Sequence, residues 1–293
     1  MKKIPPTVEL KQSDMCLLDV CLERLGLGRH IDAVHRVLNE YEDCPSMPHD
    51  ELLETVFDEI VYRVDEQKAE MRTKMARFPN QSTIENFEFN RIGQAVEALV
   101  RGLSKNCAWI KRHENILFKG PSGVGKTHLS IALGRQATAL GYSTLFVTAN
   151  ELLDMLNQAL VRNTYESKLR CLQRNDLLII DELGIPLSKK PMNGKIFYDV
   201  MNGRCGKKST IITTNRKVTD WFETLGGDVV SIRAGLDRFL ESCHRVEIQG
   251  KSYRLEAFKA LNSPNKQGSS TATVEKKDAT AADLETSNLD NLV

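Results

Sequence analysis

The chain has 293 residues, of which 41% are hydrophobic and 27% are charged, a composition typical of soluble globular proteins. Its net charge of +1 at pH 7 gives no overall basic character, so binding to nucleic acid would need a local basic patch. No apolar run approaches the roughly 18 residues of a membrane span, and the N-terminal MKKIPPTVELKQSD lacks the apolar stretch of a signal peptide. We therefore expect a cytoplasmic protein with no membrane partner.

The seven cysteines are scattered, and none forms a C-x-x-C pair. The six histidines also show no metal-ligand spacing. This pattern argues against a disulfide framework and against a structural zinc site.

Residues 1–79 are predicted to form a small helical domain. Apolar residues follow Ser13 at helical spacing, and a second helix is expected from Ile31 to Tyr41. The third helix has the clearest stripe, formed by Leu52, Leu53, Val56, Phe57, Ile60, Val61 and Val64. These stripes can form the core of the domain, or part of them can dock a partner.

Residues 80–262 alternate strand and helix patterns, and this favours a parallel α/β sheet. The apolar run 177–181 is typical of a strand buried on both faces. The expected strands are Asn115–Lys119, Ser143–Thr148, Leu177–Asp181 and Thr210–Thr214. Residues 263–293 contain no aromatic residue and are rich in small polar residues, so this tail is predicted to be disordered.

The segment between the first strand and the next helix reads G-P-S-G-V-G-K-T, a complete P-loop. Its glycines let backbone N–H groups turn toward phosphate oxygens, and the following helix directs its positive end at the same anion. Lys126 is expected to reach the β- and γ-phosphates of ATP, and Thr127 to ligate Mg²⁺. The predicted ATP-binding residues are Gly120, Pro121, Ser122, Gly123, Val124, Gly125, Lys126 and Thr127.

Two acids follow the apolar strand 177–181. Asp181 is predicted to hold Mg²⁺, and Glu182 to act as the general base for the attacking water. Asn215 follows the strand 210–214, so it should lie at the same sheet edge and contact the γ-phosphate or the water. The alternatives are that the acids merely end a strand and that Asn215 is a turn or cap residue.

Four motifs together resemble the IstB/DnaC group of AAA+ ATPases, and most closely its IstB-like transposition helper proteins of insertion sequences. They are GPSGVGKTHLSIALG, LLIIDELG, STIITTN and GLDRFLESCHRVEIQGKSYR. The resemblance covers about Met15 to Leu261, and it is strongest from Phe78 onward. One departure is the Asp181–Glu182 pair, where many members carry two aspartates. The lid domain common in other AAA+ proteins is expected to be nearly absent, which fits the group.

The resemblance implies that ATP lies between subunits and that a neighbouring subunit supplies an arginine finger. Arg238, in the segment LDRF, is the candidate for this finger, with Arg233 as the alternative. Arg254 matches a late arginine that senses the γ-phosphate. A solvated surface charge is the simpler explanation for each. His128 and Phe87 are placed with the ATP-binding residues, although Phe87 can equally be a core aromatic.

The resemblance also implies an extra helix that grips DNA after the second strand. Its candidate contacts to DNA phosphates are Arg162, Lys168, Arg170 and Arg174, and Lys189 and Lys190, in the loop after the two acids, are expected to face a central DNA channel. A solvated helix face would show the same pattern.

The resemblance favours an ATPase that forms homo-oligomers on double-stranded DNA and assists a transposase in target selection or in assembly of the strand-transfer complex. The alternative is a DnaC-like adaptor that loads a replicative helicase. A P-loop small-molecule kinase fits less well, because the Asp-Glu pair and LDRF suit hydrolysis and ring assembly.

Overall fold

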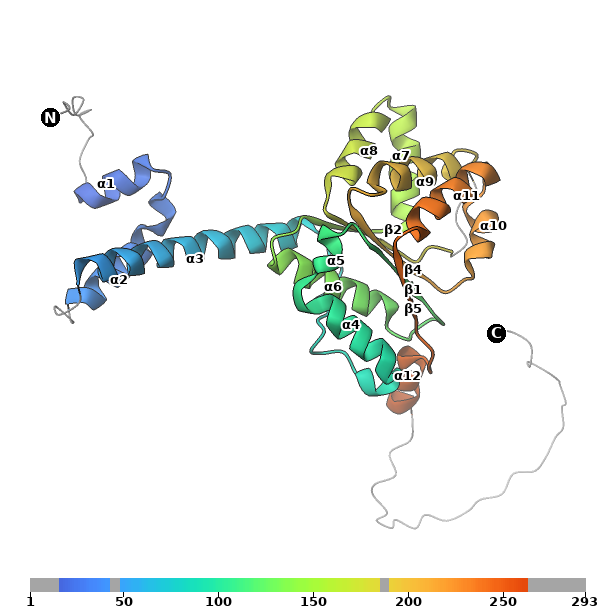
Figure 1. Cartoon of the computed structure of the whole chain (residues 1–293), viewed down its shortest axis with the longest axis horizontal. Helices are drawn as coiled ribbons and strands as arrows, with labels where there is room; N and C mark the ends of the chain where they lie inside the picture. Colours follow the sequence, from blue (N-terminus) through green and yellow to red (C-terminus); the bar gives the residue numbers. More distant parts are fainter. Residues whose placement is uncertain (1–15, 43–47, 185–189, 263–293) are drawn as a thin grey trace, which may run out of the picture.

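The computed structural model describes residues 16–42, 48–184 and 190–262 (Figure 1). The tail predicted to be disordered, 263–293, lies outside the described residues, and so does Lys189. Among the described residues, no helix is both long and apolar enough to span a lipid bilayer.

The centre of the molecule is a parallel sheet of five strands in the order β2-β3-β4-β1-β5. The strands are β1 (Asn115–Lys119), β2 (Thr144–Thr148), β3 (Leu177–Asp181), β4 (Ser209–Thr214) and β5 (Cys243–Glu247). The first four coincide with the predicted strands to within one residue. The predicted α/β fold class is therefore confirmed.

Strand β5 was not predicted, because its sequence, CHRVE, carries no apolar run. It lies at one edge of the sheet and pairs only with β1, and Val246 is its single buried residue. An edge strand with one buried side chain lacks the continuous apolar pattern of a central strand.

Alternate side chains of the central strands pack into two separate cores. Leu178 and Ile180 face a core shared with one layer of helices, whereas Leu177 and Ile179 face the other layer. The first layer contains α7 (Ala149–Val161), α8 (Tyr165–Arg174), α9 (Asn193–Arg204), α10 (Trp221–Leu225) and α11 (Val229–Leu240). The second contains α4 (Gln94–Asn106), α5 (Ala108–Lys111) and α6 (Lys126–Ala139) (Figure 1).

Short turns of 3-10 helix and a last α-helix complete the described chain. They are η1 (Gly28–His30), η2 (Phe89–Arg91), η3 (Val218–Asp220) and α12 (Tyr253–Asn262).

The first two helices, α1 (Leu17–Arg24) and α2 (Ile31–Glu42), lie at the far end of the long helix α3 (His49–Met75), away from the sheet (Figure 1). They share a core with that end of α3. Their core is small: among the described residues, only Leu22, Val34 and Ile60 are fully buried in it.

The predicted stripe of α3 is shared between this core and the surface. Ile60 is buried with Val56 and Val64 against it. In contrast, Leu53, Phe57 and Val61 are each more than half exposed, at 57%, 59% and 56%. Two short helices cover only part of a stripe this wide, so both predicted uses of the stripe remain open.

The other end of α3 is attached to the sheet. The Arg72 guanidinium donates to the carbonyl of Thr138 at 3.1 Å, and the Phe146 N–H of β2 donates to the carbonyl of Ala76 at 2.8 Å. The helix therefore runs without a break from the N-terminal helices to the edge of the sheet. The domain boundary predicted at residue 79 stays a prediction.

The carboxyl ends of β3, β4 and β1 lie side by side in the sheet. Lys119, the last residue of β1, is paired with Thr214, the last residue of β4. The P-loop after β1, Glu182 after β3 and Asn215 after β4 therefore leave the sheet at one edge, where ligands bind in parallel α/β folds.

Candidate nucleotide-binding site

The P-loop connects β1 to α6 as a tight turn. Gly123 and Gly125 have φ angles of 79° and 96°, which a residue with a Cβ rarely adopts. A Cβ on Gly125 would also collide with the Phe87 ring, and one on Gly123 with the Ser252 hydroxyl. The sequence therefore needs glycine at both positions, and α6 begins directly after them at Lys126.

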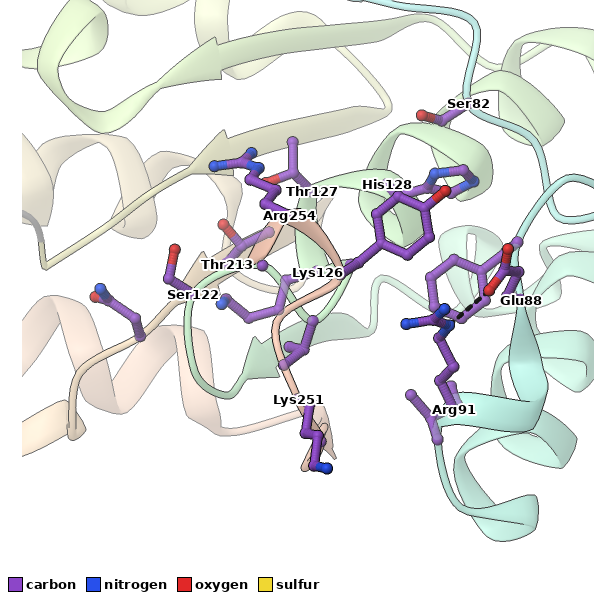
Figure 2. Close-up of a pocket in the computed structure, with 18 of the residues that line it drawn as sticks. Ser82, Glu88, Arg91, Ser122, Lys126, Thr127, His128, Thr213, Lys251 and Arg254 are labelled. Atoms are coloured by element: carbon purple, nitrogen blue, oxygen red, sulfur yellow. Dashed lines mark hydrogen bonds and ion pairs between the residues drawn. The ribbon is translucent and has the colours of Figure 1, made fainter. Parts of the chain in front are cut away.

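A pocket of about 370 Å³ opens in front of this loop (Figure 2). Most of the predicted site residues line it, although they come from distant parts of the chain. These are Ser122, Gly123, Val124, Gly125, Lys126, Thr127, His128, Glu182, Asn215, Phe87 and Arg254.

The Lys126 ammonium lies inside the curve of the loop. It donates to the carbonyl oxygens of Gly120 and Pro121 at 2.8 and 2.6 Å. Burial lowers the pKa of Lys126, and the nearby carboxylates of Asp181 and Glu182 oppose that shift. The loop thus holds a cation next to the N-terminus of a helix, an arrangement that attracts phosphate.

Thr127 and Asp181 contact each other across the sheet edge. The Thr127 hydroxyl lies 3.0 Å from both carboxylate oxygens of Asp181, a buried residue. Burial raises the pKa of Asp181, while hydrogen bonds from Thr213 and Thr127 act in the opposite direction. A hydroxyl beside a carboxylate supplies the oxygen ligands that a hard divalent cation takes, so these residues fit Mg²⁺.

Thr213, which the sequence analysis did not single out, connects the two acids. Its hydroxyl donates to Asp181 Oδ1 at 2.5 Å and accepts the N–H of Glu182 at 2.9 Å. Glu182 has a φ of 60°, a left-handed conformation that is uncommon for a residue with a side chain. Thr213 therefore fixes the backbone that aims Glu182 at the pocket. The sign of this role in the sequence is that β4 ends in two hydroxyl residues, of which Thr213 is the first.

Phe87 and His128 close one side of the pocket. Their ring centroids are 5.2 Å apart, and His128 Nε2 lies 2.9 Å from the carbonyl oxygen of Thr83. Phe87 also packs against the core beneath α6. Phe87 therefore lines the pocket and also belongs to the core, so the two predicted roles, ATP contact and core packing, are compatible.

The chain after β5 covers the other side of the P-loop. The Tyr253 N–H donates to the carbonyl of Gly123 at 2.9 Å. Arg91 forms ion pairs with Glu88 and Glu256, and its guanidinium lies 4.9 Å from the Tyr253 ring centroid (Figure 2). We call residues 248–256 the strap. They follow β5, in the part of the chain where the sequence predicted the near absence of a lid domain.

Comparison with known protein families identifies the family of this chain. The family described as "IstB-like ATP binding protein" matches residues 20–260, which is more than half of the chain. The chain belongs to this family.

Relatives of this IstB-like protein come from insertion sequences. It is 33% identical to an insertion sequence IS5376 protein of Geobacillus stearothermophilus named for ATP binding, over 74% of this chain and 85% of the relative. It is 38% identical to a protein of insertion sequence IS21 from Pseudomonas aeruginosa with the same description, over 64% of this chain and 69% of the relative.

A solved structure supports the fold. A replication initiator DnaA bound to AMPPCP and single-stranded DNA matches with a TM-score of 0.50 and 23% identity. The match covers 65% of this chain and 58% of the DnaA chain, so the IstB-like protein spans less than two thirds of that structure. With the strand order of its sheet, this confirms the AAA+ fold.

Arg238 of the IstB-like protein is held on the surface of α11, and the pocket is lined by other residues. Its Nε donates to Asn202 Oδ1 at 2.7 Å, its Nη1 donates to the Ala234 carbonyl at 3.0 Å, and its guanidinium lies 5.0 Å from the Tyr198 ring centroid. Arg233, the alternative finger, is exposed on the same helix. The structure therefore places neither arginine in the pocket of its own chain.

The predicted DNA contacts lie apart from the pocket. Lys168, Arg170 and Arg174 are exposed on α8, and Arg162 is exposed just after α7. Lys190 forms an ion pair with Asp154 at 2.7 Å. Four of the six predicted residues thus share one region of the surface.

A buried arginine fixes the end of α8 that carries Arg174. Arg204 is 1% exposed, and it donates to the carbonyls of Leu172, Asn175 and Ser209 and to the Thr210 hydroxyl. A charged residue is rarely buried so completely unless its donors find partners. Arg204 therefore joins α8 to β4 rigidly.

Proposed function

We propose that this protein is an ATPase that assembles on double-stranded DNA when ATP is bound, and that it assists a transposase in target selection or in assembly of the strand-transfer complex. The observation that carries the proposal is that Lys126, Thr127 and Glu182 line one pocket, with the buried Asp181 hydrogen-bonded to Thr127, while Arg238 lies outside it. The insertion-sequence relatives supply the biological setting.

In this proposal, Lys126 leaves the carbonyls of Gly120 and Pro121 to contact the β- and γ-phosphates. The residues that would hold Mg²⁺ are Thr127 and Asp181, whose oxygen atoms already meet. When bound, the ion neutralises the charge of the phosphate oxygens. Glu182 takes a proton from the attacking water, and Asn215, exposed at the same edge, orients that water or the γ-phosphate.

The position of Arg238 supports assembly as part of the reaction. A guanidinium stabilises the charge that develops on the γ-phosphate, and this one does not reach the pocket of its own chain. A neighbouring subunit would therefore complete the site. Hydrolysis then depends on oligomerisation: bound ATP permits assembly, and hydrolysis follows once subunits are in contact.

The exposed basic residues of α8 are the proposed contacts to DNA phosphates. Contacts of this kind tolerate any sequence and weaken with salt. Because Arg204 joins the end of α8 to β4, the backbone that carries these residues is anchored to the sheet.

The central experiment is imaging of the protein with duplex DNA and a non-hydrolysable ATP analogue. We expect oligomers that need both ligands, and gel filtration should give the same result. Monomers under all conditions would contradict the proposal.

The double variant Lys168→Gln/Arg174→Gln is expected to weaken binding to duplex DNA for all sequences alike. If both side chains contact phosphates, the slope of log Kd against log salt falls by about 2. The matched control is Lys105→Gln/Lys111→Gln, which removes two exposed charges at α4 and α5, on the opposite face of the sheet. Equal effects of the two double variants on fluorescence-anisotropy titrations would show that α8 is not the DNA-binding surface.

Thr213→Val is expected to reduce ATP hydrolysis with little change in ATP affinity. Valine keeps the shape but leaves the Glu182 N–H without its acceptor and Asp181 with only the Thr127 hydroxyl of its two hydroxyl donors, a loss of about 1–3 kcal/mol, or about 5- to 150-fold in rate. Steady-state turnover and nucleotide titration separate the two quantities. Thr213→Ser restores the hydroxyl and should restore the rate, whereas equal rates for the valine and serine variants would rule out this role.

The helicase-loading alternative rests on the exposed row Leu53, Phe57 and Val61 of α3, which offers a surface for a partner protein. The genetic context separates the two functions. A transposase reading frame beside the gene favours transposition, and a replication operon favours helicase loading.

A further inference from the structure

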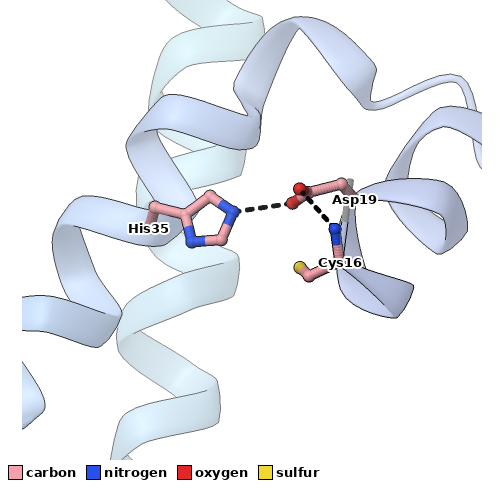
Figure 3. A group of neighbouring side chains, drawn as sticks. All are labelled: Cys16, Asp19 and His35. Carbon is pink, nitrogen blue, oxygen red and sulfur yellow. Dashed lines mark hydrogen bonds and ion pairs between the residues drawn. The ribbon is translucent and has the colours of Figure 1, made fainter. Parts of the chain in front are cut away.

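Three metal-ligating side chains meet where α1 and α2 approach each other, far from the nucleotide pocket. They are Cys16, Asp19 and His35, and their ligand atoms all lie within 4.8 Å of one another. His35 Nε2 is 2.6 Å from Asp19 Oδ1, and Figure 3 shows the three side chains gathered around one point between the helices. The spacing of the cysteines and histidines argued against a structural zinc site, but here the third ligand type is a carboxylate, which that spacing does not report.

We propose that Cys16, Asp19 and His35 bind a zinc ion, with water in the fourth position. Thiolate sulfur, imidazole nitrogen and carboxylate oxygen are the three ligand types that zinc takes in proteins, and a tetrahedral site separates them by about 3.4–3.6 Å. The Asp19–His35 pair needs to open by about 1 Å from its hydrogen-bonded distance to reach this range, and the Cys16 sulfur already lies within 4.8 Å of both partners.

The local structure already holds these ligands near the required positions. Cys16 precedes α1 and its N–H donates to Asp19 Oδ2 at 3.2 Å, so one helix turn presents two ligands together. Cys16 is exposed and the His35 side chain is 40% exposed, so an ion has access from solvent.

The N-terminal helices gain from a metal because their own core is small. Among the described residues, the hydrophobic cluster of these helices has three buried members, Leu22, Val34 and Ile60, and α1 has only 8 residues. Helical units with so little buried apolar surface commonly need a metal or another cross-link. A zinc ion on these three ligands would fix α1 to α2.

The simpler explanation is a helix cap joined to an ion pair. It accounts for Asp19 and His35, and it requires neither a thiol at position 16 nor an ion. The two explanations differ in what they predict for the sulfur, so the thiol is the group to test.

The test is titration of the full-length protein, reduced and freed of metal, with Co²⁺ in the absence of nucleotide. Tetrahedral cobalt bound to a thiolate gives a charge-transfer band that an oxygen-only site near the P-loop does not produce. We expect one cobalt per chain with this band, displaced by Zn²⁺, and lost in Cys16→Ser and in His35→Ala.

Cys21→Ser is the matched control, because Cys21 is a second exposed cysteine on α1 that lies outside the cluster. It should keep the band and the bound metal. Far-UV circular dichroism of each variant with and without chelator shows whether it has folded. No band in the wild-type protein, or a band that survives Cys16→Ser in a folded variant, overturns the proposal.

Competition with a chromophoric chelator measures the affinity of the protein for zinc directly. The readouts are independent of ATP hydrolysis, so they hold whatever the function of the nucleotide site.

Discussion

Glu182→Gln is expected to bind ATP as tightly as the wild-type protein and to hydrolyse it about 10²- to 10⁴-fold more slowly. Glutamine keeps the size and the polarity of the side chain but cannot accept a proton from water, and general-base catalysis contributes about this factor. The side chain is exposed at the pocket, on the loop after β3 and not on the P-loop itself.

Two measurements are needed, because binding and hydrolysis should separate. Nucleotide affinity follows from titration with a fluorescent ATP analogue, and the chemical step follows from phosphate release in a single turnover. Glu70→Gln, on the exposed surface of α3, makes the same chemical change away from the pocket and should leave both quantities unchanged. Lys126→Ala should show the opposite pattern, with loss of nucleotide binding itself. Equal turnover by Glu182→Gln and wild type would move the base to another residue.

The sequence predicted the central strands of the sheet because short, continuous apolar runs are typical of strands buried on both faces. The run 177–181 is buried along its whole length, and 115–119 is buried at all but its last residue. Once these strands are taken as parallel, their carboxyl ends must share an edge. The approach of the P-loop, Glu182 and Asn215 to one another then follows from topology, without any knowledge of side-chain packing.

The contacts that the sequence did not predict are made between residues whose own patterns are ordinary. Arg91 and Glu256 are 165 residues apart, and each resembles a solvated charge until the strap is folded over the P-loop. Arg204 also looks like a surface residue, and only the carbonyls at the ends of α8 and β4 explain its burial. Pairings of this kind depend on the final packing, whereas periodicity reports only which face of an element is apolar.

Thr213 shows the same limit inside the site. Its position at the end of a buried strand was predicted, but its two hydrogen bonds depend on how β3 and β4 are aligned. The sequence could place the groups that carry the chemistry, and the structure was needed to show what holds them.

Arg238→Ala is expected to keep the ATP affinity of the isolated subunit and to lose the turnover that assembly stimulates, by about 10³- to 10⁵-fold if this residue is the arginine finger. The physical reason is its position: the guanidinium contacts Asn202, Ala234 and Tyr198 on its own chain and does not line its own pocket. Turnover is measured as a function of protein concentration with DNA present. Arg233→Ala is the control, and a loss of turnover in that variant alone would move the finger to Arg233.

A mixing experiment separates supply by a neighbour from action within one chain. Arg238→Ala subunits keep Glu182, and Glu182→Gln subunits keep Arg238, so each variant lacks only what the other retains. If the finger acts across the interface, a pocket of the first variant beside an Arg238 of the second is complete, and a mixture recovers part of the activity. If both residues act on the same pocket of one chain, no arrangement restores a complete site and the mixture stays inactive. Recovery on mixing would therefore establish that ATP hydrolysis in this family member reports contact between subunits.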